Sequence, residues 1–301
     1  MVKYFLLSCF LIWNFYITSQ SFWESDTTAN RVRTIGTSVT VATGWSGSMM
    51  ALSQVWYKDS WTGGFRFFND GKEWLQMDKF GHAYTANHIT RNVFNAYRWS
   101  GQSRNKSLWL GGLVGFGYLA NLEVFDGLSE DWGFSWWDMA ANTAGVGWFI
   151  GQELLWQEQR VLFKFSASLS PYAKYRPEVL GSSFSERILK DYNGQTYWFS
   201  ASPSTFIENI PLPPWLAFSI GYSIDGKLHG MDDMYEVNVN GATRTYYAER
   251  QLLFSLDVNF ERIHTNNSFL KAMFKALNHI KVPFPTLLVS PSSTSFVPVY
   301  F

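Results

Sequence analysis

Three ionisable side chains lie within five residues in the segment DKFGHAYTANH (78–88), namely Asp78, Lys79 and His82. Asp78 and His82 are four residues apart, so in a helix they share one face, with Lys79 beside them. Such a set could be a catalytic pair in which Asp78 orients His82 as a base. It could also be half of a metal site, or a buried ion pair that holds helices together.

Two further polar pairs interrupt segments that otherwise read as apolar helices. Glu123 and Asp126 are three residues apart in LWLGGLVGFGYLANLEVFDG, and Asp138 and Asn142 are four apart in WGFSWWDMAANTAGVG. Each pair lines one helical face. Because an isolated carboxylate in an apolar helix is destabilising, we expect these groups to meet inside a helical bundle. The predicted polar cluster comprises Asp78, Lys79, His82, Glu123, Asp126, Asp138 and Asn142.

We interpret this cluster as a structural network in which Lys79 and protonated His82 neutralise acids across the bundle, in a protein that is not an enzyme and needs no cofactor. The alternative is a site for a divalent metal or a small ligand, with a hydrolytic function. Its ligands would be Asp78, His82, Glu123 and Asp138. The single histidine in the set disfavours zinc. We find no glycine-rich phosphate loop and no nucleophile elbow in a suitable context.

Two other histidines are interpreted as ordinary residues. His88 is six residues from His82, so the two side chains point apart, and we expect its replacement to leave stability unchanged. His229 lies in the turn DGKLHGMDD, whose aspartates could hold calcium. The spacing fits no known calcium loop, so we predict a solvated turn there.

The composition indicates a protein that works beside a membrane. Lys plus Arg and Asp plus Glu are both 24, so no overall field attracts nucleic acid. Aromatic residues make up 19% of the chain and charged residues only 16%. An excess of Trp, Tyr and Phe suits a lipid–water boundary. We expect membrane lipid or outer-membrane proteins as partners, and the oligomeric state is left open.

The N-terminal segment MVKYFLLSCFLIWNFYITSQS predicts a secretory signal over residues 1–20. Its apolar run is too short for a spanning helix, which needs roughly 20 residues. Cys9 lies in LLSC, a sequence similar to a lipoprotein processing site, but few apolar residues precede it and many follow, which disfavours lipid attachment. We predict export to the envelope of a Gram-negative bacterium, at the outer membrane, with its periplasmic face as the alternative.

The periodicity predicts an α+β fold. A small-residue-rich helical bundle over 21–159 contains helices at 76–98, 107–125 and 136–158, and is followed by an antiparallel β-rich region over 160–301. Residues 34–57 form an uncharged, small-residue-rich run that suits close helix packing, and 61–74 reads as a turn region.

The β-rich region shows alternation with a period of two. Strands are predicted at 160–169, 216–225 and 252–260, hairpin turns at 193–194 and 240–241, and an amphipathic helix at 268–281. The longer strands resemble staves of outer-membrane barrels, but we count only four to six strands, and a complete barrel needs at least eight. We therefore expect a half-buried sheet covered by helices.

The elements DKFGH, LEVFDG and GFSWWDMAANTAGVGWFIG, in this order, resemble the YfiM-type domain of predicted outer-membrane lipoproteins, whose function is unassigned. Their order is also similar to that of the VanZ-like membrane family. The resemblance covers about residues 75–151, and residues 160–301 match neither family. It implies a location at the envelope but no reaction. The matching positions are Asp78, Lys79, His82, Glu123, Asp126, Trp136, Asp138 and Gly145.

Overall fold

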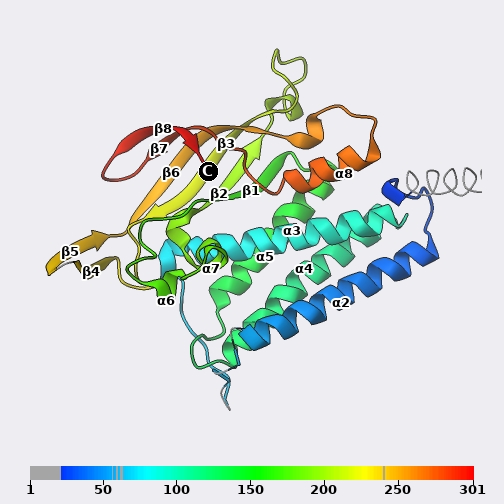
Figure 1. Ribbon diagram of the computed structural model, residues 1–301. Helices are drawn as coiled ribbons and strands as arrows, with labels where there is room; N and C mark the ends of the chain where they lie inside the picture. Colours follow the sequence, from blue (N-terminus) through cyan, green and yellow to red (C-terminus); the bar gives the residue numbers. More distant parts are fainter. Residues whose placement is uncertain (1–21, 56, 59, 62–63, 240) are drawn as a thin grey trace, which may run out of the picture.

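The computed structural model describes residues 22–55, 57–58, 60–61, 64–239 and 241–301, and Figure 1 shows their arrangement. The predicted signal peptide, including Cys9, lies outside the described residues. Helices come first along the chain and an antiparallel sheet follows, so the predicted α+β fold is confirmed. The change from helix to strand falls between Leu155 and Val161. A division into two domains at residue 160 stays a prediction.

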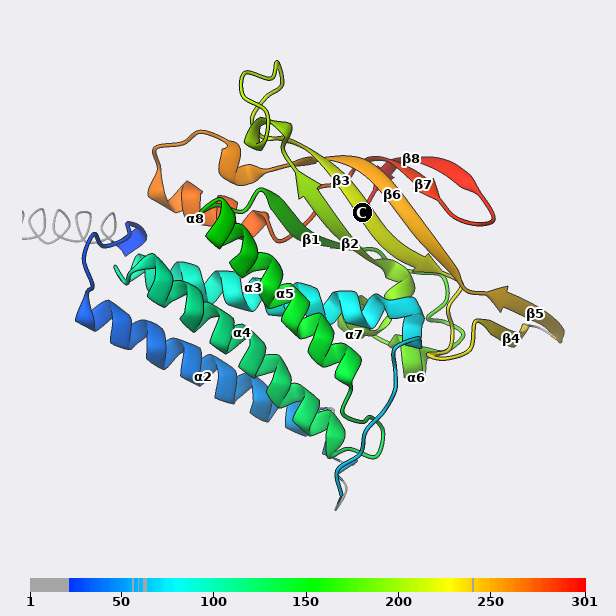
Figure 2. The same ribbon diagram turned by 180° about the vertical axis from the view of Figure 1, so that it is seen from behind.

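Among the described residues, four long helices form the first part. They are α2 (Arg31–Val55), α3 (Met77–Trp99), α4 (Arg104–Gly127) and α5 (Trp136–Leu155), and the short helix η1 (Glu73–Gln76) precedes α3. In both views α3 lies between the sheet and α4, while α2 runs along the outer side of α4 (Figures 1 and 2). The three helices predicted within 76–158 are therefore confirmed. Helix α4 begins earlier than expected because the Ser103 hydroxyl accepts a hydrogen bond from the Lys106 amide.

Small residues let these helices approach one another closely. A Cβ atom at Gly145 of α5 would lie only 2.0 Å from the carbonyl oxygen of Ala83 in α3. On α4, a Cβ atom at Gly111 would lie 2.6 Å from the carbonyl oxygen of Thr90. The three helices thus meet backbone to backbone, and polar side chains on the same faces are brought together as well.

We predict that Gly145→Ala destabilises the protein by about 1–3 kcal/mol, because the new methyl group must push α5 away from α3. Gly147→Ala in the same helix is the matched control, since nothing lies within 4 Å of its Cβ position. The control should be neutral or stabilising by up to about 1 kcal/mol through helix propensity. Thermal and urea unfolding followed by circular dichroism measure both effects. Equal stability of the two variants would contradict this packing.

Six strands form the main sheet in the order β1-β2-β3-β6-β7-β8, and all neighbours are antiparallel. The strands are β1 (Val161–Ala167), β2 (Gln195–Ala201), β3 (Leu216–Asp225), β6 (Glu249–Val258), β7 (Phe284–Val289) and β8 (Thr294–Tyr300). Strands β4 (Met234–Val239) and β5 (Ala242–Tyr247) form a separate hairpin that projects from the body (Figures 1 and 2).

The remaining elements are short and connect the strands. They are α6 (Pro177–Leu180), α7 (Phe184–Lys190), η2 (Tyr192–Gly194), η3 (Pro203–Thr205), η4 (Phe260–Arg262) and α8 (Ser268–Leu277). Helix α8 confirms the predicted amphipathic helix, although it ends before residue 281 because His279–Lys281 pair with the free edge of β1.

One of the two predicted hairpin turns is wrong. Asn193 and Gly194 lie in η2 ahead of β2, because the Asp191 carboxylate accepts hydrogen bonds from both the backbone amide and the side chain of Asn193. The last β4–β5 pair joins Val239 to Ala242, and the predicted turn at 240–241 includes residue 240, which lies outside the described residues.

The helices cover only part of the sheet. Aromatic contacts join α3 and α5 to β1 and β2, for example Phe80 to Tyr197 at 6.0 Å between ring centres and Trp148 to Phe199 at 5.2 Å. The core that these contacts extend contains Leu75, Met77, Phe163, Tyr197 and Ile224. The outer face of β3 and β6 is instead exposed. The expectation of an apolar face buried under helices is therefore wrong for these strands.

Among the described residues, α4 is the one helix that is long and apolar enough to cross a membrane. Core helices of soluble proteins meet the same criterion. Helix α4 packs against both α3 and α5, and it carries Glu123 and Asp126 near its C-terminal end.

Candidate functional site: a buried cluster of acids, lysine and histidine

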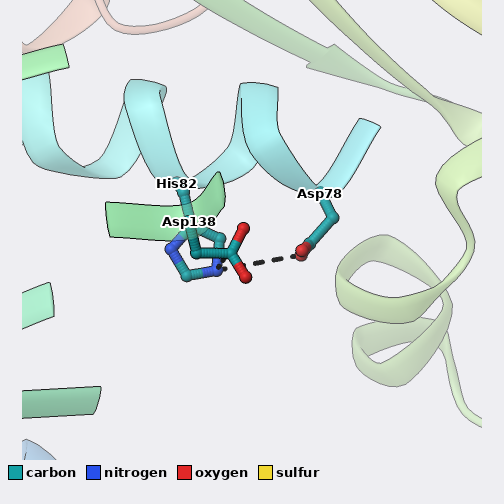
Figure 3. Close-up of side chains that lie close together, drawn as sticks. All are labelled: Asp78, His82 and Asp138. Atoms are coloured by element: carbon teal, nitrogen blue, oxygen red, sulfur yellow. Dashed lines mark ion pairs between the residues drawn. The ribbon is translucent and has the colours of Figure 1, made fainter. Parts of the chain in front are cut away.

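The predicted polar residues meet where the N-terminal ends of α3 and α5 approach the C-terminal end of α4. Figure 3 shows Asp78 and His82 projecting from α3 towards Asp138 of α5. Asp78 and Asp138 both lie in the first turn of their helices, where the helix dipole favours a negative charge. Two helix N-termini therefore support the acidic side of the cluster.

Lys79 is the central cation of the cluster. Its Nζ atom lies 2.6 Å from Asp70 Oδ2, 2.7 Å from Asp138 Oδ1 and 3.0 Å from Asp78 Oδ2. These carboxylates come from the loop before η1, from α5 and from α3. Only 12% of the Lys79 side chain is exposed, so the ammonium group exchanges most of its water for carboxylate oxygens.

His82 lies beside Lys79 and faces both neighbouring helices. Its Nδ1 atom is 3.1 Å from Asn142 Oδ1 and 3.6 Å from Glu123 Oε1. Its Nε2 atom is 3.9 Å from Asp78 Oδ1 and from Asp138 Oδ1. The ring is thus surrounded by oxygen atoms from three helices.

Glu123 is the most deeply buried acid of the cluster. Its side chain is 1% exposed, and Oε2 accepts a hydrogen bond of 3.1 Å from the Ser135 amide. Its other oxygen, Oε1, has no hydrogen-bond partner, and neither has the buried Nδ2 atom of Asn142. Asp126, one turn further along α4, accepts a hydrogen bond of 2.6 Å from the Tyr57 hydroxyl. Asp126 is therefore at the margin of the cluster.

The structure adds residues that the sequence did not reveal. Asp70 contacts Lys79 and accepts a hydrogen bond from the Ser135 hydroxyl, and Tyr192 donates a hydrogen bond of 2.8 Å to Asp78 Oδ1. Ser135 also caps α5 by accepting from the Asp138 amide, so the S-x-x-D spacing at 135–138 was a readable signal. Asp70 lies in the motif Asn-Asp-Gly, which indicates a turn rather than a member of the cluster. No local sequence pattern indicates that Tyr192 belongs to the cluster.

A left-handed turn joins the Asp70 loop to α3. Trp74, Leu75 and Gln76 have φ values of 48°, 50° and 67°, a conformation that is unfavourable for residues with a side chain. Contacts from β3 and from the loop after it hold this turn: the Tyr222 hydroxyl donates to the Leu75 carbonyl at 2.6 Å, and the Trp74 amide donates to the Gly230 carbonyl at 2.8 Å. The sheet therefore helps to position Asp70 against Lys79.

The charged groups of the cluster have shifted pKa values. Burial alone would raise the pKa of Asp78, but His82, Lys79 and the Tyr192 hydroxyl lower it to about 2. Burial alone would lower the pKa of Lys79, but Asp78 and Asp138 raise it above its ordinary value. Asp78 and Lys79 are therefore both ionised at neutral pH.

Three other acids shift in the opposite direction. Burial, followed by the charge of Asp78, raises the pKa of Asp138 to about 10. Burial and then Asp126 raise the pKa of Glu123 to about 8. Burial also raises the pKa of Asp126 to about 7, although the hydrogen bond from Tyr57 opposes this. At neutral pH Asp138 and Glu123 are therefore largely protonated, and the Asp138 carboxyl group donates a hydrogen bond that helps to lower the pKa of Asp70.

The geometry permits one metal-binding arrangement among the described residues. One oxygen each of Asp78 and Asp138 and one nitrogen of His82 lie within 4.8 Å of one another. Glu123 lies on the far side of the His82 ring, so of the four predicted ligands it is the one outside this group. The Lys79 ammonium group already contacts both aspartates, which places a protein cation next to the position that a metal would take.

The two histidines interpreted above as ordinary residues, His88 and His229, lie apart from the cluster. His88 is 5% exposed, and its Nε2 atom lies 2.7 Å from the Phe163 carbonyl oxygen, so it is part of the contact between α3 and β1. The expectation that His88 could be replaced without loss of stability is therefore wrong, because a buried, hydrogen-bonded ring would be lost. His229 lies in an exposed turn and pairs with Asp232 at 3.1 Å, as the predicted solvated turn requires.

The fold and cluster together define a class: an α+β protein whose helical part encloses acids around one lysine and one histidine. Residues 64–150 match the model of the family described as "Predicted periplasmic lipoprotein (DUF2279)". No curated protein and no solved structure matches the chain. The family match supports the predicted envelope domain of unknown function and the predicted export, over nearly the residues expected. It carries neither the YfiM-type nor the VanZ-like name, and Cys9 lies outside the matched range.

The raised pKa values predict that stability falls as the pH rises from about 5 to about 8. In this range Glu123 and Asp138 are already ionised in the unfolded chain, whereas the folded protein retains their protons. Each such acid therefore lowers the free energy of unfolding by up to about 1.4 kcal/mol per pH unit. Below about pH 4 the slope reverses, because Asp78 must then be protonated. The melting temperature, measured with a chelator present, should be higher at pH 5.5 than at pH 8.

Glu123→Gln is the matched variant for this prediction, because it preserves the shape of the side chain and removes its titration. It should flatten the pH dependence and melt at or above the wild-type temperature at pH 8. A wild-type melting temperature that rises between pH 5.5 and pH 8 would contradict the protonation states assigned to Glu123 and Asp138.

Proposed function

We propose that this chain is a non-enzymatic protein of the cell envelope, associated with the outer membrane, and that its polar cluster is a structural network. The match to a predicted periplasmic lipoprotein supports the envelope, and the resemblance to YfiM-type domains and the abundance of aromatic residues favour the outer membrane. Lipid or outer-membrane proteins are the partners that this location offers, and no feature favours nucleic acid.

One observation carries the structural role: the Lys79 ammonium group lies within 3.0 Å of carboxylates from three separate segments. A catalytic lysine or histidine needs a free position at which it can meet a substrate. Here Lys79 is shared among Asp70, Asp78 and Asp138, and the His82 ring is enclosed by oxygens of α3, α4 and α5. These contacts join α3, α4, α5 and the loop before η1 to one another.

We predict that Asp138→Ala destabilises the protein by about 3–5 kcal/mol, because it removes one of the three buried partners of Lys79 and the carboxyl group that hydrogen-bonds to Asp70. Asp138→Asn is the matched control. Since Asp138 is largely protonated, the Asn amide can donate to Asp70 as the acid does, and the loss should be less than about 1.5 kcal/mol. Urea unfolding of the two variants at pH 7 gives both values. An Asp138→Ala variant as stable as wild type would overturn the structural role.

A divalent-cation site is the second candidate, and a specific observation favours it. Asp78, His82 and Asp138 each offer a ligand atom within 4.8 Å of the others, and Oε1 of Glu123 is buried without a hydrogen-bond partner 3.6 Å from His82. A cation here would have to displace Lys79 from two of its carboxylates. Mixed nitrogen and oxygen ligands suit a first-row transition metal rather than calcium.

Metal analysis of the purified protein distinguishes the two candidates. The structural network predicts no stoichiometric metal in the wild type, and none in His82→Ala or Asp138→Asn. One equivalent of metal in the wild type, lost in both variants, would establish the cation site, because Asp138→Asn removes a ligand charge while keeping the hydrogen bond. Mn²⁺, Co²⁺ and Zn²⁺ are each added before gel filtration, so that a site emptied during purification is refilled.

A further inference from the structure

The main sheet turns its apolar side outwards and its polar side inwards. On β3, Ser219 and Ser223 are buried, whereas Phe218 and Ile220 are exposed. On β6, Ser255 and Asp257 are buried between exposed apolar residues. An antiparallel sheet with one solvent-exposed face normally shows the opposite arrangement, with polar residues on the exposed face and apolar residues on the buried face. Seven large apolar side chains on the outer face are between 37% and 66% exposed, namely Phe218, Ile220, Leu252, Phe254, Leu256, Leu287 and Phe296.

The polar interior fixes this orientation. Lys164 of β1 and Asp257 of β6 form an ion pair of 2.8 Å with both side chains fully buried, and Lys164 also donates to the Val258 carbonyl at 2.7 Å. The sheet curls so far that the Tyr300 hydroxyl of β8 lies 2.9 Å from the Thr196 hydroxyl of β2. A shift of one residue in any strand would bring these groups to the outside, so the apolar face cannot turn inwards.

The exposed apolar residues form one continuous surface, which we call the outer face of β3, β6, β7 and β8. Strand register places Phe218 opposite Leu256 and Ile220 opposite Phe254. Phe254 is in turn opposite Leu287 of β7, and Leu287 is opposite Phe296 of β8. Figures 1 and 2 show β6, β7 and β8 far from α2 and α4, with α3 between the sheet and these two helices. The surface thus crosses four strands without a break.

The chemistry of this face favours lipid over a protein partner. Between Leu216 and Tyr222 the outward positions of β3 hold no charged group, and the same holds between Leu252 and Val258 on β6. Protein interfaces carry about one hydrogen bond per 100–200 Å², which this face cannot provide. Along β3 it extends for about 20 Å, close to the apolar band of about 25 Å on outer-membrane proteins. Trp215, 37% exposed, stands at one end, as in an interfacial aromatic belt.

We propose that the outer face of β3, β6, β7 and β8 is a lipid-binding surface that lies against the hydrocarbon region of a bilayer. This inference rests on the membrane association proposed above and names the part of the protein that makes the contact. A hydrocarbon environment explains why the apolar side chains are outside while an ion pair and several serines are inside. It also explains why α3 and α5 leave these strands uncovered.

Flotation with vesicles of phosphatidylethanolamine and phosphatidylglycerol tests the surface. The double variant Ile220→Asn/Phe254→Asn changes two cross-strand neighbours at its centre. The matched control, Phe184→Asn/Leu189→Asn, changes two exposed apolar residues of α7, outside the face. Wild type and control should float with the vesicles. The face variant should bind the vesicles at least about tenfold more weakly. All three should melt at similar temperatures, because the altered side chains are exposed.

Two outcomes would overturn the proposal. One is a face variant that floats as well as wild type. The other is a wild-type protein that does not float and forms a dimer in light scattering, while the face variant is a monomer, since the face would then bind a second copy of the chain. Cell fractionation separates this inference from the proposed function. Wild-type protein outside the membrane fraction refutes the membrane association, whereas a face variant that remains in that fraction refutes only the surface.

Discussion

The buried ammonium group of Lys79 is the constraint on which the helical part depends. Asp70, Asp78 and Asp138 come from a loop and two helices, and their carboxylates would repel one another once they leave water. One cation at 3.0 Å or less from all three makes their common burial favourable. Because Asp138 also keeps a proton, the cluster does not need a second buried cation. Charge neutralisation and protonation together set how the three segments meet.

Close helix packing and the polar cluster depend on each other. On α5, Asp138, Asn142 and Gly145 follow one another at helical spacing, so one face carries first the polar groups and then the small residue. Gly145 meets the backbone at Ala83, the residue directly after His82. The contact that lets the helices approach therefore also presses the polar groups together. A larger residue at Gly145 and a missing charge partner would disturb the same interface.

The sheet, like the helical part, buries a lysine together with an acidic partner. Lys164 and Asp257 lose all their exposure inside the curled sheet, and their ion pair leaves neither charge without a partner there. Once the interior is polar, alternation along each strand places the apolar side chains outside. The left-handed turn at Trp74–Gln76 connects the two parts, because the sheet residue Tyr222 holds it through a hydrogen bond to Leu75. The position of Asp70 in the cluster thus depends on the sheet.

By itself, the sequence indicated α3, α4, α5, α8 and the strands β1, β3 and β6, and which of their side chains share a face, because a period of 3.6 or 2 is a local property. It did not locate β2, β7 or β8. It also indicated that Asp78, His82 and Asp138 should meet, since isolated acids in apolar helices need partners. Only the tertiary structure decided that Asp70 and Tyr192 join them, because these contacts link segments that no local pattern relates. It also decided which side of the sheet is covered, because alternation shows that two faces differ but not which one faces inwards.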